Sequence, residues 1–214
     1  EEAIDRVAGA ISDSVREHGA ESVAFYLSGQ LLTEDYYIAN KLAKGFIGTP
    51  HVDTNSRLCM SSAVAAHKRA FGEDCVPGCY EDLELADLLV LAGSNAAWAH
   101  PVLYQRMSAA RRQGRRVVVI DPRKTATADL ADLHLQLRPG TDTLLFNGLL
   151  VWLHDHGALA EDYLAEHCNG FEETLAIARS CAPSVQAVAR GCDLAVEEGE
   201  CFYRWFVDTG RTVT

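Results

Sequence analysis

Short apolar runs with the length of buried strands alternate with amphipathic helical stretches along this 214-residue chain. Residues 87–92 and 116–121 are nearly continuous apolar runs, while residues 3–17 repeat apolar side chains at the spacing of one helix face. Alternation of this kind predicts an α/β fold, with mostly parallel sheets and helices on both faces in a three-layer αβα arrangement.

Glycine and capping residues divide the pattern into individual elements. Gly19, Gly45 and Gly72 each follow a helical stretch and predict its end, and Thr33 and Thr141 are expected to cap the helices that they precede. We predict a loop over 48–58. Helices are predicted over 3–17, 60–71 and 101–113, from the Thr33 cap to about Lys44 and from the Thr141 cap to about His154. Further helices are predicted to start near Glu161, Phe171, Ser184 and Val196. Strands are predicted over 22–27, 87–92, 116–121, 133–137 and from Arg211.

Charge and cysteine content exclude several classes of protein. The net charge of −11 argues against a nucleic-acid partner, and no apolar run reaches the ~18 residues of a membrane span. The first residues do not resemble a secretory signal, so we expect a cytoplasmic location and no membrane association. Seven cysteines, an odd number, argue against a disulfide framework, and most are expected to be small buried residues. The cluster Arg111, Arg112, Arg115 and Arg116 is read as a solvated helix end.

Four loops that follow predicted strands combine small residues with polar ones. In parallel sheets, ligands bind at the carboxyl ends of the strands, and amides at the following helix starts favour phosphate. The loops therefore indicate a nucleotide-like ligand, although neither glycine-rich dinucleotide nor P-loop motifs occur. They are Ser28-Gly29-Gln30, Gly93-Ser94-Asn95, Asp121-Pro122-Arg123-Lys124-Thr125 and Pro139-Gly140-Thr141-Asp142.

Cys59 is a candidate metal ligand on its own chemistry. A thiolate is a soft ligand for a redox metal, and the predicted helix start beside it, together with Arg57, is expected to lower the thiol pKa. A lone cysteine is more often structural, so this reading depends on its surroundings.

The segment Asp53–Ser62 resembles the molybdenum-ligand segment of the bis-molybdopterin (dimethyl sulfoxide reductase-type) oxidoreductases. The loops around 28–37, 78–82, 93–101, 120–123 and 139–142 follow that family in order, so the resemblance covers essentially the whole chain. Among its members, the chain is most similar to assimilatory nitrate reductases. The fold implied is that of the second and third domains of these enzymes, with residues 1–54 as an incomplete first domain and residues 55–214 as a second domain.

The resemblance implies molybdenum bound by Cys59 and by two copies of molybdopterin guanine dinucleotide. Cys59, Met60 and Arg57 would be the catalytic residues, and Met60 stands where formate dehydrogenases of the family carry a proton-handling His. Asp142 would recognise guanine, since a carboxylate accepts from the ring N–H and the amino group. The other cofactor-binding residues implied are Ser28, Gly29, Gln30, Asn55, Ser62, Gly93, Ser94, Asn95, His100, Asp121, Arg123, Thr125, Pro139 and Gly140.

The reaction implied is reduction of nitrate to nitrite, with ferredoxin, flavodoxin or a reduced nicotinamide-linked partner as electron donor. The family's 4Fe-4S cluster motif is not in this chain and is expected in a preceding region, so we expect a central fragment that is inactive alone. Two alternatives remain open: a molybdenum formate dehydrogenase-type oxidoreductase, and a non-catalytic nucleotide-binding scaffold in which Cys59 is structural.

Overall fold

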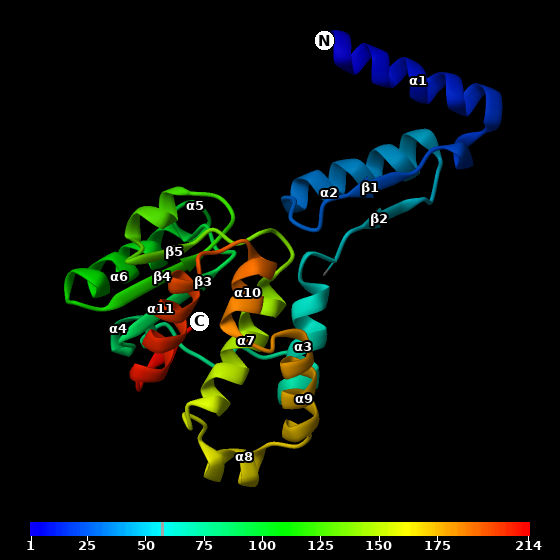
Figure 1. Ribbon diagram of the computed structural model, residues 1–214. Helices are drawn as coiled ribbons and strands as arrows, with labels where there is room; N and C mark the ends of the chain where they lie inside the picture. The colour runs from blue at the N-terminus through cyan, green and yellow to red at the C-terminus, as the bar shows by residue number, and fades with distance from the viewer. Residues whose placement is uncertain (57) are drawn as a thin grey trace. The chain divides into compact units, whose positions relative to one another are not determined.

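The computed structural model describes residues 1–56 and 58–214, which form two compact units, Glu1–Val76 and Pro77–Thr214 (Figure 1). The sequence predicted a domain boundary between residues 54 and 55, whereas the contacts within the chain divide it between Val76 and Pro77. Helix α3 (Ser61–Phe71) therefore groups with the first unit by its contacts. The assignment of residues 55–76 to a domain of the parent fold stays a prediction.

The first unit is built around a two-stranded parallel sheet. Strands β1 (Phe25–Leu27) and β2 (Val52–Thr54) pair in register from Phe25 opposite Val52. Among the described residues of this unit, only Ala43 and Thr49 are buried. The remaining elements are α1 (Glu2–His18), η1 (Ala20–Ser22), α2 (Thr33–Asn40), the π-helical segment η2 (Lys41–Ile47) and the 3-10 turn η3 (Leu58–Met60).

Two predictions for the first unit are wrong. Residues 52–54 were expected in a loop, but they form β2, because β1 supplies the hydrogen-bonding partner that their mixed polarity did not indicate. The helix predicted to stop at Gly45 continues as η2 and ends at Gly48, whose φ of 86° is the left-handed conformation that glycine adopts most readily.

The predicted cap Thr33 is also wrong, because Thr33 is the first residue of α2 and Leu32 precedes it as the cap. The backbone amide of Leu32 donates to Asp35 Oδ2 at 3.3 Å, so the acidic first turn stabilises this helix start. Gly72 does end α3, with a φ of 83°.

The second unit contains a four-stranded sheet in the order β5-β4-β3-β6. Every pairing in it is parallel, which confirms the fold class predicted from the alternation of strands and helices. The strands are β3 (Leu88–Ala92), β4 (Arg116–Ile120), β5 (Leu133–Leu135) and β6 (Thr212–Val213).

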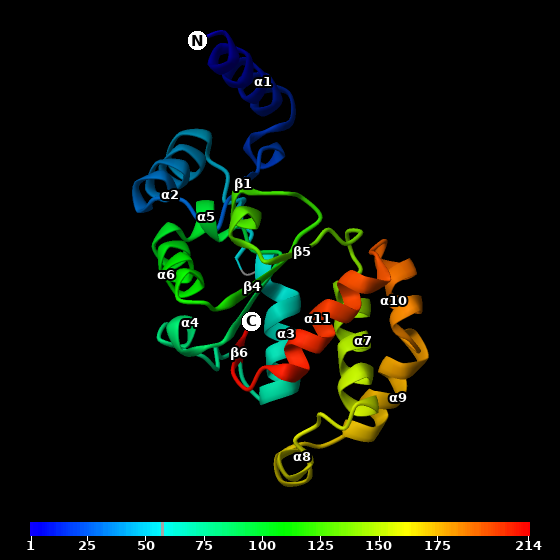
Figure 2. The same ribbon diagram turned by 60° about the vertical axis from the view of Figure 1, so that its left-hand side comes forward.

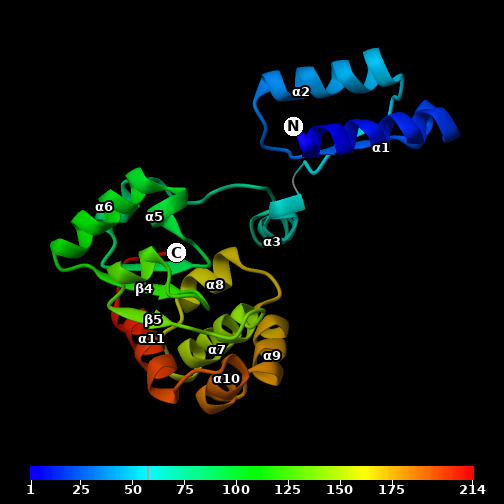
Figure 3. The ribbon, with the colours of Figure 1, turned by 90° about the horizontal axis from the view of Figure 1, so that it is seen from above.

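Alternate side chains of the strands enter two separate cores, because successive residues of a strand point to opposite faces. Leu88 and Val90 join the core with α7 (Asp142–Asp155), α10 (Val185–Cys192) and α11 (Val196–Asp208), and Leu89 joins the core with α5 (Ala96–Ala99) and α6 (Pro101–Arg112). Figure 3 shows these helices on the two sides of β4 and β5. The helical segments are α4 (Asp82–Leu85), α5 (Ala96–Ala99), α6 (Pro101–Arg112), η4 (Ala126–Leu130), α7 (Asp142–Asp155), α8 (Glu161–His167), α9 (Phe171–Cys181), α10 (Val185–Cys192) and α11 (Val196–Asp208).

Helices α7, α9 and α10 run side by side, and α8 connects α7 to α9 (Figure 2). Val151 of α7 packs against Leu175 and Ala178 of α9 in a small core of its own. The start predicted near Ser184 is confirmed, because the Ser184 side chain accepts from the Ala187 amide at 3.2 Å and caps α10.

The cysteines are all free, but the expectation that most are buried is wrong. Cys192 is buried, Cys75 and Cys201 are half-buried, and Cys59, Cys79, Cys168 and Cys181 are exposed. No helix of the described residues combines the length and apolarity required to cross a bilayer.

The arginine cluster before β4 is more than a solvated helix end. Arg111 donates to Asp132 at 2.8 Å, Arg115 lies 3.5 Å from Asp87, and Arg116 stacks 4.8 Å over the ring of Trp205. These side chains therefore tie the amino end of β4 to neighbouring elements.

Candidate cofactor-binding site

Three of the predicted loops meet at one edge of the sheet in the second unit. Loop Gly93-Ser94-Asn95 follows β3, loop 121–125 follows β4, and loop 139–142 follows β5. Since β3, β4 and β5 are parallel neighbours, their carboxyl ends lie at the same edge. The structure thereby places these predicted residues where ligands of open α/β sheets bind.

A buried threonine that the sequence reasoning missed joins two of these loops. Thr127 Oγ1 donates to Asn95 Oδ1 at 2.8 Å and accepts from the Ala97 amide at 3.0 Å. Thr127 is fully buried, so this hydroxyl fixes loop 93–95 against η4. No local sequence pattern marks a contact between residues 32 positions apart.

Asp121 organises the turn after β4. Its side chain is buried, and Oδ1 accepts from the Arg123 amide at 2.8 Å and lies 3.9 Å from Arg123 Nε. Asp121 therefore holds the turn in shape, while the Arg123 side chain, 75% exposed, remains accessible to an anion. The Thr125 amide donates to the Arg123 carbonyl at 3.0 Å and completes the turn.

One polar atom in this turn lacks a protein partner. Thr125 Oγ1 is buried, yet it makes no hydrogen bond within the described residues. A buried hydroxyl without a partner is costly, and a bound ligand would remove that cost.

Glycines in the left-handed region shape the other two loops. Gly93 has a φ of 62° and Gly140 a φ of 80°, and a Cβ at either position would meet no heavy atom within 4 Å. Both residues leave backbone exposed beside the loop, which permits close approach by a ligand.

Asp142 is exposed at the first position of α7, where its charge also favours the helix start. Thr141 is the N-cap residue of α7 as predicted, but its hydroxyl makes no cap hydrogen bond to the helix, because Oγ1 donates to the Arg138 carbonyl at 2.6 Å. Arg138 in turn donates its backbone amide to the Cys192 carbonyl at 2.7 Å and its side chain to the Gly191 carbonyl. These bonds fix loop 139–142 against the end of α10.

His100 is exposed at the junction of α5 and α6. It ends α5 and precedes Pro101, the first residue of α6. Its backbone amide donates to the Ala96 carbonyl at 2.9 Å, so the His-Pro pair forms a tight turn at this edge. A role of the His100 ring in cofactor binding stays a prediction.

The predicted metal ligand lies in the first unit. Cys59 is a free, exposed thiol in η3, directly before α3, and Met60 is the cap residue of that helix. Ser62 is exposed in the first turn of α3, where backbone amides have no acceptor within the helix. Arg57 lies outside the described residues.

The loops after β1 and β2 meet in the same unit. Asn55 Oδ1 accepts from the Gly29 amide at 2.5 Å, and the Asn55 amide donates to the Leu27 carbonyl at 3.4 Å. Ser28 Oγ accepts from the Gln30 amide at 3.2 Å. The predicted residues Ser28, Gly29, Gln30 and Asn55 therefore form one cluster that leads into Cys59.

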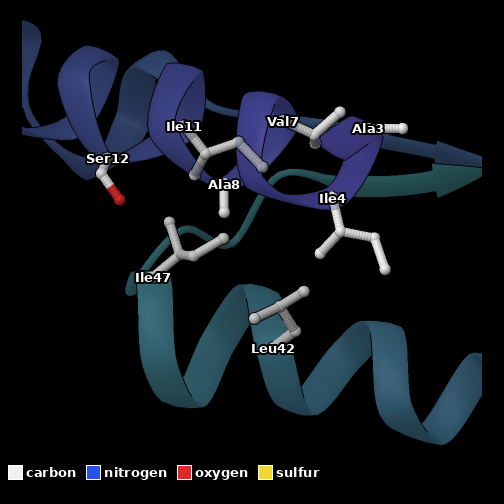
Figure 4. Close-up of a pocket in the computed structure, with 8 residues that line it drawn as sticks. All are labelled: Ala3, Ile4, Val7, Ala8, Ile11, Ser12, Leu42 and Ile47. Atoms are coloured by element: carbon white, nitrogen blue, oxygen red, sulfur yellow. The ribbon is translucent and has the colours of Figure 1, made fainter. Parts of the chain in front are cut away.

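The first unit also has a hollow of about 540 Å³ between α1 and η2 (Figure 4). Ile4, Val7 and Ile11 of α1 face Leu42 and Ile47 across it. Its lining is almost wholly aliphatic, so it lacks the polar groups that orient a cofactor. We therefore exclude this hollow as the cofactor site.

Comparison with known proteins gives a family. Residues 1–178 match the family described as molybdopterin oxidoreductase. The chain is 51% identical to a nitrate reductase of Shewanella frigidimarina over 97% of its length and 53% identical to a nitrate reductase of Klebsiella oxytoca over 95%. It spans only 22% and 23% of those two relatives.

A solved structure agrees with the fold. Acetylene hydratase from Pelobacter acetylenicus matches 99% of this chain and 28% of its own with a TM-score of 0.64. At 22% identity, this likeness supports the fold alone.

Proposed function

Because this chain belongs to the molybdopterin oxidoreductase family, we propose that it is part of a molybdenum-dependent assimilatory nitrate reductase. The observation that carries the proposal is Cys59, a free, exposed thiol in η3, directly before α3, in a chain about half identical to two nitrate reductases. Thiolate sulfur suits a redox metal of this kind. A cytoplasmic location belongs to the same proposal.

Cys59 would hold molybdenum together with the sulfurs of two molybdopterin guanine dinucleotides. The bound cofactor supplies the two-electron chemistry by which nitrate and two protons become nitrite and water. Met60 cannot accept a proton, which suits a reaction without proton removal from the substrate and favours nitrate over formate. A 4Fe-4S cluster in a preceding region and a ferredoxin, flavodoxin or nicotinamide-linked donor would supply the electrons.

The sheet edge in the second unit fits a nucleotide-bearing cofactor. The exposed Asp142 carboxylate can accept from guanine, and the exposed Arg123 guanidinium can bind phosphate. Gly93 and Gly140 allow backbone to approach it, and the Thr125 hydroxyl lacks a protein partner there. Asp121 and Asn95 would act through the shape of the loops, since their side chains already bond to Arg123 and Thr127.

Replacing Cys59 in the full-length parent protein tests the proposal. In Cys59→Ala, we expect nitrate reduction to fall at least ~100-fold and X-ray absorption to show one sulfur fewer around molybdenum. Cys168→Ala is the matched control, because Cys168 is also free and exposed but lies in the second unit. Unchanged activity and sulfur count in Cys59→Ala would support the scaffold alternative, and formate oxidation by the unmodified parent would support the formate dehydrogenase alternative.

We also expect the 214-residue chain alone to be inactive and to hold no molybdenum. Its predicted metal ligand has few buried neighbours, because the first unit buries only two of its described residues. Elemental analysis of the purified chain measures this, and a stoichiometric amount of molybdenum would contradict it.

A further inference from the structure

One tyrosine hydroxyl spans the turn after β1. Tyr36, on α2, donates from Oη to the Ser28 carbonyl at 2.6 Å and accepts from the Leu31 amide at 3.2 Å. The two bonds close the turn at both of its ends. The position of the turn is therefore linked to α2.

Asn55 holds the same turn from the opposite loop. Its Oδ1 accepts from the Gly29 amide, and its carbonyl accepts from the Leu58 amide at 3.2 Å. The residue following Leu58 is Cys59. Asn55 thus connects the turn after β1 with the start of η3, which carries the proposed metal ligand.

The contact requires glycine at position 29. A Cβ there would lie 2.9 Å from Asn55 Oδ1 and 3.7 Å from the Ser56 Cα. A side chain at position 29 would push the two loops apart, so their close approach depends on glycine at this position.

We propose that Tyr36 and Asn55 are positioning residues that clamp the Ser28–Leu31 turn and hold it against the loop carrying Cys59. This inference rests on the proposed function, because the two loops would lie beside the molybdenum cofactor. Asn55 acts here through its acceptor oxygen, and Tyr36 acts only through its hydroxyl. Neither residue needs to touch the cofactor for this role.

The test uses the full-length parent enzyme. Tyr36→Phe removes the hydroxyl and keeps the ring. Tyr37→Phe is the matched control, because the Tyr37 side chain is exposed and its contact with Lys41 is made by the ring, which phenylalanine keeps. We expect Tyr36→Phe to speed hydrogen exchange of residues 28–31, alter the Mo(V) electron paramagnetic resonance signal and lower kcat by about 10- to 100-fold, with KM little changed. Tyr37→Phe should match the unmodified enzyme in every measurement.

A second pair of variants separates the clamp from direct cofactor binding. Asn55→Asp keeps an acceptor oxygen for the Gly29 amide, whereas Asn55→Leu removes it. We expect Asn55→Asp to keep the exchange protection of residues 28–31, and Asn55→Leu to lose it as Tyr36→Phe does. Equal loss of exchange protection in both Asn55 variants would overturn the clamp. An unchanged Mo(V) signal in Tyr36→Phe would overturn it as well. If the unmodified parent contains no molybdenum, the proposed function is overturned. This outcome is distinct from failure of the clamp, because it is seen without any substitution.

Discussion

Gly148 of α7 lies close to side chains of both α10 and α11. A Cβ at this position would contact Tyr203 Oη and lie 2.6 Å from Val188 Cγ2. Tyr203 is held in place by its own hydrogen bond from Oη to the Leu145 carbonyl at 2.7 Å. The burial that raises the pKa of the Tyr203 hydroxyl leaves little space for it to move aside.

Gly148→Ala is therefore expected to destabilise the 214-residue chain by about 1–3 kcal/mol through overpacking. Denaturant-induced unfolding followed by tryptophan fluorescence measures the change. Gly210→Ala is the control, because a Cβ at Gly210 meets no heavy atom within 4 Å, and its effect should stay within about 0.5 kcal/mol. Equal stability of the two variants would contradict the packing described for α7, α10 and α11.

For single residues, the sequence indicated which functional groups could bind a ligand more readily than which groups each side chain contacts in the fold. Cys59 and Asp142 are both exposed, the sequence indicated them as candidate ligands from residue type and position, and their roles stay predictions. Thr127 and Tyr36 were missed, because a Thr or Tyr hydroxyl bonds to whatever group the fold brings near it. Asp121 and Asn95 were predicted as cofactor contacts, and the structure shows that their side chains also hold the loops.

At the scale of elements, α7 and α9 are joined by an ion pair at one end. Arg179 Nη1 donates to Asp155 Oδ2 at 3.0 Å, and a second guanidinium nitrogen bonds to Oδ1. The Arg179 guanidinium, with a smaller contribution from His154, holds the pKa of the Asp155 carboxyl well below its usual range. The ionised carboxylate is thus favoured in the folded state.

Because the pKa of the Asp155 carboxyl is lowered in the folded state, the contribution of this ion pair to the free energy of unfolding depends on pH. The contribution is fully present above the unfolded pKa of about 3.9 and is lost as pH falls through the folded value. We expect Asp155→Asn to lower Tm at pH 7 and the difference from the unmodified chain to shrink below about pH 4. Thermal unfolding at pH 7, 5, 4 and 3 measures this. A constant difference over that range would mean that the ion pair does not stabilise α7 against α9.

The helix ends show what neighbouring residues alone can predict. α10 starts beside Ser184 and α3 ends at Gly72 as predicted, since a helix end depends on groups within about four residues. Gly45 does not end its helix, because the chain continues as a π-helical segment to a second glycine, Gly48. Two glycines three residues apart offer two possible ends, and the local pattern did not distinguish them.

For the whole molecule, burial is distributed unequally between the units. The second unit has two large cores on the two faces of its sheet, whereas the first unit buries only Ala43 and Thr49 among its described residues. Protection from hydrogen exchange depends on buried contacts and can differ between parts of one chain.

We expect amides of β3 and β4 in the 214-residue chain to exchange at least ~100-fold more slowly than those of β1 and β2. Hydrogen exchange measured by mass spectrometry on peptides from 22–30, 50–56, 86–93 and 115–121 tests this. In the full-length parent, the four peptides should exchange at similar rates if other parts of the protein cover the first unit. Equal protection in the isolated chain would contradict the unequal burial.

The sequence by itself determined the α/β class, the existence of most helices and strands, the family, and the chemical types of the candidate ligands. These depend on periodicity, helix ends and motifs, all of which are local. Only the tertiary structure decided that β2 pairs with β1, that Asn55 meets Gly29, and that Thr127 meets Asn95. Those contacts join residues 26 or more positions apart, and the hydrogen-bonding groups involved have many possible partners until the fold selects one.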